Sequence, residues 1–336
     1  MLAVASSVTA AGVGLAGLWL WGQERAPGSG HVSFVVGSND TPSEIAERLA
    51  RAGLVRGAGW FAWYKRIYAA SASFEAGEHW LSSGSTPREL VQLLARRQAR
   101  PSLRVTIPEG WDSFQVARRL ASEGICGQDA FLAVVFDEQL AQRLVGAGSF
   151  EGYLYPASYD LRVNATPKWL VEKFSKEARS RFAAVEGSNG ARGLTAHQLV
   201  TLASIVQKEA ADAEEMPRVA SVFFNRLEDP RFRPLRMLQS DPTAGYGCKR
   251  AEQLPSCEHF DGRITAAMLR DGSNPYNTYK HPGLPPGPIG NPSAGALQSV
   301  IAAPRSEYYF FVAGPGGRHV FSRSLKEHRR AIQGRD

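Results

Sequence analysis

One carboxyl group in this sequence has the placement that acid catalysis requires. Glu209 lies near the end of the segment LVTLASIVQKEA (199–210), which we expect to be a helix opened by a capping box of Thr195 and Gln198. Glu209 lies four residues after Ile205, so it continues the apolar face of that helix. Burial disfavours the charged form of a carboxyl group and raises its pKa, which suits a general acid near neutral pH. The same periodicity also fits a solvated residue at a helix end.

Polar side chains that could bind sugar hydroxyls follow Glu209 along the chain. The segment RMLQSDPTAGYG (236–247) is typical of a polar, turn-rich loop, and residues 276–279 combine rings, hydroxyls and an amide. Such residues could equally be turn residues that hydrogen-bond to their own backbone. The candidate substrate-binding or supporting residues are Glu151, Asn225, Gln239, Ser240, Asp241, Thr243, Tyr276, Asn277 and Thr278.

The cysteines and histidines do not form a metal-binding pattern. Cys248 and Cys257 share one Gly/Pro-rich segment, Cys126 is distant, and no CxxC pair exists. We therefore expect no metal and no organic cofactor. In an exported domain Cys248 and Cys257 could form a disulfide, and two unpaired loop thiols are the alternative.

The composition favours a folded, basic protein. The chain has 336 residues, of which 43% are hydrophobic and 21% charged, enough for roughly two domains with buried cores. The net charge of +7 fits anionic membranes, nucleic acids or acidic polymers. No recognition helix, aromatic RNA-binding motif or zinc-finger spacing is present, so we expect no nucleic acid partner.

The N-terminus predicts a membrane anchor. Residues 2–22 carry no charge and end in Trp19, Leu20 and Trp21, which suits a bilayer-spanning helix with an interfacial tryptophan. We assign residues 1–22 to a transmembrane anchor and 23–31 to a linker. A cleaved signal peptide is the alternative, although a basic start and a clear cleavage site are missing.

An internal repeat organises the next part of the chain. Residues 35–54 align with residues 106–125, and each copy combines a β-like run, a turn, a capped helix and a glycine stop. The β-α-α-β pattern of residues 32–100 is similar to LysM-like glycan-binding modules, and a mere packing unit is the alternative. Residues 101–148 read as a second, repeat-like α/β subdomain, with a helix expected over 130–145.

The remaining residues, 149–336, read as a denser domain beginning near residues 146–149. Its last part predicts a β-hairpin, in which YYFFVA pairs with GGRHVFS across residues 314–317. The expected fold class is therefore α+β: an N-terminal transmembrane helix, a LysM-like β-α-α-β module, and a mixed α+β catalytic domain.

Six motifs in a fixed order resemble one family. Together they are similar to the YceG-like (MltG) family of endolytic murein transglycosylases. The motifs are FEGYLYPASYDL (150–161), LASIVQKEA (202–210), VASVFFNRL (219–227), LQSDPTAGYG (238–247), NPYNTYKHPGLPPGPIGNPS (274–293) and YYFFVAGPGGRHVFSRSLKEH (308–328).

The resemblance implies which acid is catalytic. The family motif carries two acids, and the second maps to Glu209, whereas the first is Gln207 here. Were the first acid essential, this chain would be inactive. Glu151 matches another family acid and is expected to support the site, with core hydrogen bonding as the alternative. The Pro/Gly-rich segment 281–292 is expected to be a rigid loop lining the glycan groove.

The implied reaction is non-hydrolytic cleavage of the bond between N-acetylmuramic acid and N-acetylglucosamine, leaving 1,6-anhydromuramyl ends and limiting the length of nascent strands. The resemblance also implies a single-pass protein of the inner membrane with its catalytic domain on the extracytoplasmic side. Glycan strands and peptidoglycan synthases are the expected partners. The alternatives are an inactive peptidoglycan-binding scaffold and a muramidase that uses water.

Overall fold

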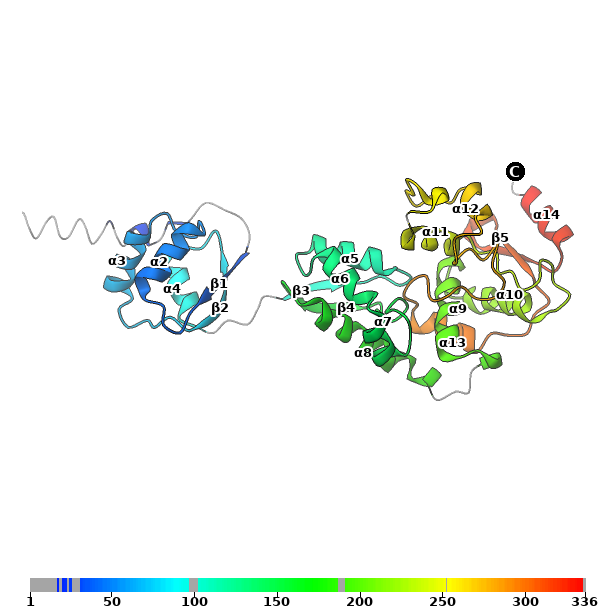
Figure 1. The fold of residues 1–336 in the computed structure, drawn as a ribbon, viewed down its shortest axis with the longest axis horizontal. Helices are drawn as coiled ribbons and strands as arrows, with labels where there is room; N and C mark the ends of the chain where they lie inside the picture. Colours follow the sequence, from blue (N-terminus) through cyan, green and yellow to red (C-terminus); the bar gives the residue numbers. More distant parts are fainter. Residues whose placement is uncertain are drawn as a thin grey trace, which may run out of the picture. The chain divides into compact units, whose positions relative to one another are not determined.

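A computed structural model describes residues 17, 20–22, 24–25, 31–96, 102–186, 191–251 and 253–334 (Figure 1). The chain divides into two compact units, Met1–Pro101 and Ser102–Asp336. The predicted anchor (1–22) and linker (23–31) lie almost wholly outside the described residues. Within the described part, no helix is both long enough and apolar enough to cross a bilayer.

The first unit is built around a two-stranded antiparallel sheet, in which His31 lies opposite Ser82. Helices pack on this sheet around fully buried Leu49, Phe61 and Leu81. The predicted β-α-α-β order is confirmed. The elements are β1 (His31–Val36), α2 (Pro42–Arg51), α3 (Ala58–Tyr68), β2 (Gly77–Ser82) and α4 (Pro87–Leu94).

The second unit begins with the same strand, turn, capped helix and glycine stop as the first, so the predicted repeat is confirmed. Helices α2 and α5 start and end at equivalent positions, and Gly53 and Gly124 follow them with φ of +70° and +66°. Both glycines thus adopt the left-handed conformation that stops a helix. The elements are β3 (Ser102–Thr106), α5 (Ser113–Ser122), α6 (Gln128–Val135), α7 (Glu138–Val145), β4 (Ser158–Arg162) and α8 (Pro167–Glu186).

Two expectations for this region differ from the structure. The stretch 130–145 is helical as expected but divides into two helices, because the side chain of Asp137 caps a new helix, α7, by accepting a hydrogen bond from Leu140 N–H at 2.9 Å. The boundary expected near 146–149 falls inside one hydrophobic core, since β3 pairs with β4 across it. Phe131 and Phe150, on either side of that boundary, belong to this shared core.

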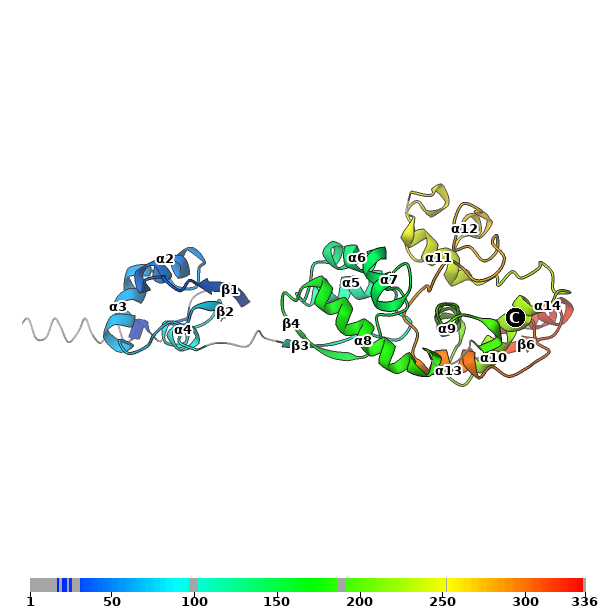
Figure 2. The same ribbon diagram turned by 60° about the horizontal axis from the view of Figure 1, so that its bottom comes forward.

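The remaining elements surround one central helix, α9. Figure 2 looks nearly along α9 and shows α11 on one side and α13 on the other, and α10 also packs on it. Residues 199–206 of α9 are all buried. The elements are α9 (Ala196–Glu209), α10 (Met216–Glu228), α11 (Asp241–Arg250), α12 (Ala266–Arg270), α13 (Ala294–Ile301), β5 (Phe310–Ala313), β6 (His319–Ser322) and α14 (Leu325–Gln333).

The segment expected to be a turn-rich loop, 236–247, is half helical, which corrects that prediction. Pro242 at the start of α11 favours a helix, because its fixed φ suits the first turn. Gly247, which suggested a turn, is instead required by packing: a Cβ there would lie 1.9 Å from Asn274 Oδ1. The predicted terminal hairpin is confirmed, with β5 antiparallel to β6.

Candidate active site

Glu209 is the last residue of α9, where the helix emerges from the core, and its side chain is half-buried. The hydroxyl of Ser240 donates a hydrogen bond to Glu209 Oε1 at 2.5 Å. Burial raises the pKa of Glu209, and nearby Asp241 raises it further, against the opposing effect of the Ser240 hydrogen bond. Desolvation therefore disfavours the charged form of this carboxyl, and its catalytic role stays a prediction.

Ser240 is placed for this contact by its own neighbours. It occupies the N-cap position of α11, yet its side chain makes no capping bond and points to Glu209 instead. Its N–H donates to Thr278 Oγ1 at 3.0 Å, and its carbonyl accepts from Thr243 Oγ1 at 2.6 Å. The predicted residues Ser240, Thr243 and Thr278 thus lie together, and the two threonines hold the serine.

Charged groups flank this pair on both sides. Tyr279 donates its hydroxyl proton to Asp241 Oδ1 at 2.6 Å, and Asp241 lines a cavity of about 260 Å³. Arg226 is buried behind Glu209 and donates to the carbonyl oxygens of Tyr309, at 2.8 Å, and of Leu238. Burial lowers the pKa of Arg226 to about 10, so it stays cationic and disfavours protonation of Glu209.

Gln207, which replaces the first acid of the family motif, has a role that an amide can fill. Its side-chain oxygen accepts hydrogen bonds from Ser293 N–H at 3.0 Å and Ser293 Oγ–H at 2.8 Å. Ser293 is the N-cap of α13, so Gln207 ties the catalytic helix to that helix. Only an acceptor oxygen is needed for this contact, and amide and carboxylate side chains both supply one.

Glu151 is a buried hub of hydrogen bonds and not a surface acid. It accepts from Ser113 N–H at 3.1 Å, from the Ser113 hydroxyl, from Tyr246 OH at 2.9 Å and from Asn291 Nδ2 at 3.3 Å. Burial raises the pKa of Glu151 to about 7, helped by the negative charge of Asp112. The side chain therefore joins α5, α11 and the 274–293 loop, as in the alternative of core hydrogen bonding, and a supporting role at the site stays a prediction.

Three charged residues that the sequence analysis did not assign to the site lie between Glu151 and Asp241. Lys249 Nζ binds Asp112 Oδ2 at 2.5 Å, and Asp112 itself is buried. Lys208 lines the 260 Å³ cavity with both of them, and burial lowers its pKa. Asp112 is also the N-cap of α5. Its partner is 137 residues away, so no local pattern could reveal the pair.

Several other predicted residues are engaged inside the protein. The amide of Asn225 donates to the carbonyls of Ser306 and Tyr308, at 2.9 and 2.8 Å, and so holds the chain before β5. Asn277 donates to backbone carbonyls at the end of α12. Their expected contact with sugars stays a prediction.

Gln239 and Tyr276 also make contacts inside the protein. Gln239 has a left-handed backbone with φ of +52°, and its N–H donates to the Thr278 carbonyl at 3.1 Å. Tyr276 packs edge-on against Tyr246, with ring centroids 4.9 Å apart. A role for either side chain in binding sugar stays a prediction.

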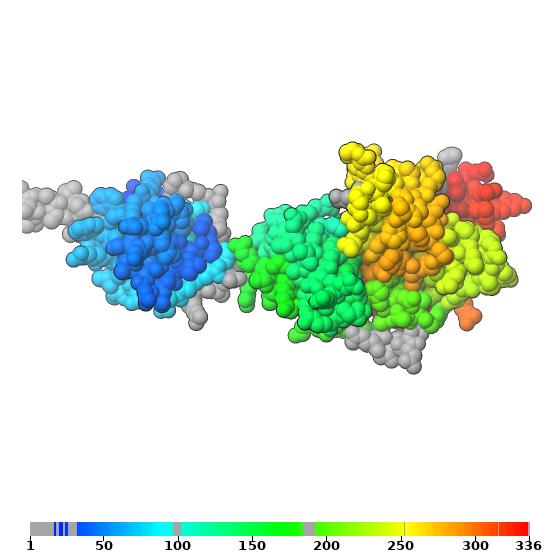
Figure 3. Space-filling view, viewed as in Figure 1, coloured from blue at the N-terminus to red at the C-terminus, as the bar shows by residue number. Residues whose placement is uncertain are grey.

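Cys248 and Cys257 form a disulfide, which settles the alternatives left open by the sequence. The bridge ties α11 to the loop after it, whereas Cys126 is a buried free thiol elsewhere. The loop and α11 form one wall of a cleft, seen in yellow beside the teal α5–α6 region in Figure 3.

Comparison with known proteins agrees with this geometry. The endolytic murein transglycosylase of Bacillus subtilis (strain 168) is 27% identical over 316 residues, covering 89% of this chain and 83% of that protein. The endolytic murein transglycosylase of Streptococcus pneumoniae serotype 2 is also 27% identical, over 332 residues, and this chain spans 58% of its length.

A solved structure and a family model extend the match over most of the chain. The crystal structure of a YceG-like protein from Listeria monocytogenes superposes with a TM-score of 0.58 at 26% identity, covering 90% of this chain and 99% of that one. The model of the YceG-like family matches residues 34–334. This chain therefore belongs to the YceG-like family.

Proposed function

We propose that this chain is an endolytic murein transglycosylase in which Glu209 acts first as the acid and then as the base. The observation that carries the proposal is the state of Glu209: a half-buried carboxyl at a helix end, with a raised pKa and one oxygen held by Ser240. Two relatives that bear this name cover about nine-tenths of the chain and support the assignment.

The hydrogen bond from Ser240 determines which oxygen of Glu209 acts. Because Oε1 accepts the serine proton, the acidic proton of the neutral carboxyl lies on Oε2. Glu209 donates that proton to the oxygen linking N-acetylmuramic acid C1 to N-acetylglucosamine O4, and the C1–O4 bond breaks. Positive charge develops on C1 and the ring oxygen, as in other glycosidic cleavages.

The second step regenerates the acid. Oε2 of the carboxylate takes the proton from the C6 hydroxyl of the same muramyl sugar while O6 bonds to C1. The products are a 1,6-anhydromuramyl end and a free O4 hydroxyl, and no water is consumed. Asp241, held by Tyr279 beside Ser240, supplies negative charge near the cationic transition state without forming a covalent bond.

Product analysis of purified glycan strands tests this proposal. Wild type is expected to give strand ends lighter by one water than reducing ends, measured by mass spectrometry. Glu209→Gln should reduce the cleavage rate at least about 100-fold, because the amide cannot donate an acidic proton. Glu228→Gln is the matched control, since Glu228 also ends a helix but is exposed and paired with Arg192, and should cut at the wild-type rate.

Each other outcome identifies a different alternative. Reducing ends would show a muramidase that uses water. Undiminished cutting by Glu209→Gln would show that another residue is the acid. No cutting by wild type would leave a peptidoglycan-binding scaffold, the reading that the glutamine at position 207 first suggested.

The surroundings of the enzyme follow from the same proposal. Residues 1–22 anchor the chain in the inner membrane, and the rest lies on the extracytoplasmic side, where murein is found and where a disulfide such as Cys248–Cys257 persists. The β-α-α-β unit of residues 32–100 acts as a LysM-like contact to glycan. The enzyme works beside peptidoglycan synthases and limits the length of nascent strands.

A further inference from the structure

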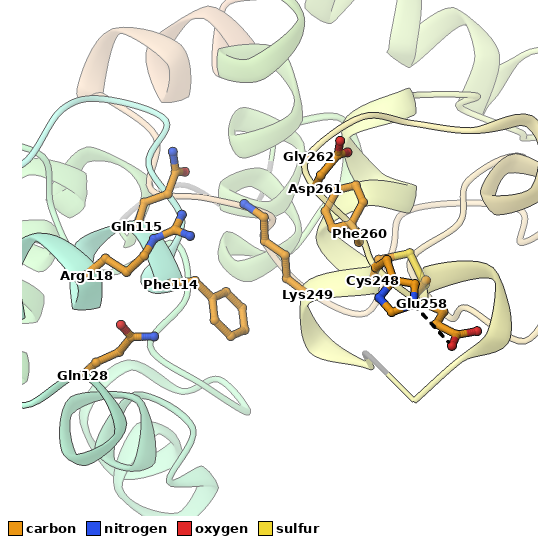
Figure 4. A pocket seen from close by; sticks show the side chains of 12 residues that line it. Phe114, Gln115, Arg118, Gln128, Cys248, Lys249, Glu258, Phe260, Asp261 and Gly262 are labelled. Carbon is orange, nitrogen blue, oxygen red and sulfur yellow. Dashed lines mark ion pairs between the residues drawn. A yellow bond between two sulfur atoms is a disulfide. The ribbon is translucent and has the colours of Figure 1, made fainter.

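A second, larger cleft opens beside the 260 Å³ cavity that Lys208 and Asp241 line. Its volume is about 760 Å³, within the range of ligand-binding sites. Lys249, Phe260 and Gly262 line both spaces, so the two adjoin. Figure 4 shows Phe114, Gln115 and Arg118 entering the cleft from one wall, and Lys249 and Phe260 from the other.

The charges that line this cleft are of both signs, and Lys249, on the α11 side, is already paired with Asp112. Arg118, on α5, has no carboxylate within 4.0 Å among the residues that the structure describes, and Gln128 lies beside it. Across the cleft, Glu258 and Asp261 are on the disulfide-tied loop, where they contact His259 and Arg263. Arg118 can therefore bind a carboxylate, and Glu258, whose printed partner is the imidazole of His259, can bind an ammonium group.

The wall that carries Arg118 also carries an aromatic ring, Phe114, which is packed in place by its neighbours. Phe114 packs against Phe136 and Tyr246, with ring centroids 5.7 and 6.4 Å away. The guanidinium group of Arg250 in turn stacks on Phe136, 3.7 Å from its ring centroid. Small apolar groups such as methyls can lie on this surface without disturbing the charged walls.

A glycan strand alone does not match this cleft. The backbone sugars of murein bear hydroxyls and acetamido groups, which are neutral and leave Arg118 without a counter-charge. The peptide stem on the lactyl group of each muramyl sugar does match. It combines alanine methyl groups, a glutamate carboxylate and, in its third residue, an amino acid with a side-chain ammonium.

We propose that the cleft lined by Phe114, Arg118, Lys249 and Glu258 binds the peptide stem of the muramyl residue being cut. This inference rests on the proposed function. Arg118 binds a stem carboxylate, Glu258 binds the ammonium of the third residue, and Phe114 supports the alanine methyl. The enzyme therefore recognises strands that still carry their peptides, and stripped strands bind more weakly.

Binding of a single-sugar probe tests the cleft without depending on cleavage. The probe is N-acetylmuramyl-L-alanyl-γ-D-glutamyl-meso-diaminopimelate, which has no glycosidic bond to cut, and calorimetry with the full chain gives its Kd. Arg118→Gln is expected to weaken binding about tenfold, the effect of losing one charge-assisted pair. The matched control is Arg119→Gln, because Arg119 is next on α5 but pairs with Glu123 at 3.2 Å.

A second probe identifies the groups that are recognised. N-acetylmuramyl-L-alanine amide lacks the charged groups of the stem and should bind more weakly and with equal affinity to wild type and Arg118→Gln. Glu258→Gln should weaken binding of the tripeptide probe only. Equal affinity of wild type for the two probes, or an unchanged Kd in Arg118→Gln, would overturn the inference. Such a result leaves the Glu209 product analysis untouched, so the two failures are distinguishable.

Discussion

The two copies of the repeat differ most in the turn between strand and helix. In the first copy the turn closes on itself: Asp40 accepts from Gly37 N–H at 2.6 Å and pairs with Arg48 at 2.6 Å. In the second copy the equivalent turn exchanges backbone hydrogen bonds with a loop that is distant along the chain. Gly110 N–H donates to the Asn291 carbonyl, and Asn291 N–H donates to the Trp111 carbonyl, both at 2.8 Å.

This difference shows how one supersecondary unit acquires a catalytic task. Both copies keep the capping box that starts the helix, with Thr41 in the first and Asp112 in the second. Only in the second does the capping residue also bind a lysine, Lys249, and only there does the next residue, Ser113, donate to a buried acid. The second copy is thus joined to the catalytic helices, and the first is complete within its own unit.

The largest expected contrast between the copies is in their response to pH. Burial raises the pKa of Glu151 from its ordinary value of 4.5 to about 7 in the folded protein. Between these pH values the folded state holds a proton that the unfolded state has lost, so the second unit loses stability as the pH rises. The loss is about 3 kcal/mol between pH 4.5 and 8. Calorimetric unfolding of wild type and Glu151→Gln across this range measures the loss. It is the difference between the two proteins in how steeply the unfolding free energy falls with pH.

The first unit should respond in the opposite sense. The backbone N–H of Gly37 lowers the pKa of Asp40, and that of Thr41 lowers the pKa of Glu44. Their stabilisation is present above pH 4 to 5 and is lost as the pH falls through the lowered values. Parallel pH profiles for wild type and Glu151→Gln would contradict the assignment of the buried hub.

Removing the capping side chain should lower the unfolding free energy of the two copies by different amounts, and this difference is smaller than the effect of pH. Thr41→Ala is expected to cost about 1 kcal/mol, the typical value of a helix cap. Asp112→Ala should cost about 2 kcal/mol, because it also leaves Lys249 without its partner. The unfolding free energy of the unit that carries each substitution, from chemical denaturation, provides the comparison. Asp112→Asn, which keeps the cap and removes the charge, should fall between the two. Equal costs for the two alanine variants would show that the Asp112–Lys249 pair adds nothing.

The smallest expected effect is that of restoring an acid at position 207. Gln207 lies against the turn of the second copy, where a Cβ on Gly110 would be 3.2 Å from its Cγ. Because Ser293 needs only an acceptor oxygen, Gln207→Glu should change the rate of strand cleavage by less than about twofold. A gain of tenfold or more would instead make a carboxyl at 207 part of the chemistry.

What the sequence predicted well is local. The bounds of α2 and α5 follow from capping boxes and glycine stops that span a few residues. Helical periodicity and a family motif agree on Glu209, and its catalytic role stays a prediction. The terminal hairpin was found because its strands are adjacent along the chain.

What the sequence could not predict depends on distant partners. The serine that holds Glu209 comes from a segment 31 residues away, and Lys249 binds an acid 137 residues away. Helix α11 was missed because its glycines weaken helix propensity, and their reason is tertiary: Ile264 and Asn274 occupy the space that side chains would need.

The contact of Gly247 with Asn274 has a mechanical consequence. With no room for a Cβ, α11 and the segment after Asn274 cannot slide past one another, and the Cys248–Cys257 bridge adds the intervening loop to the same rigid body. A polymer that binds in the cleft therefore meets one wall whose parts, α11, the bridged loop and the segment after Asn274, are fixed to one another. This wall contacts the opposite wall at two places, the Lys249–Asp112 ion pair and the stacking of Arg250 on Phe136, and any change in the width of the cleft must alter these contacts.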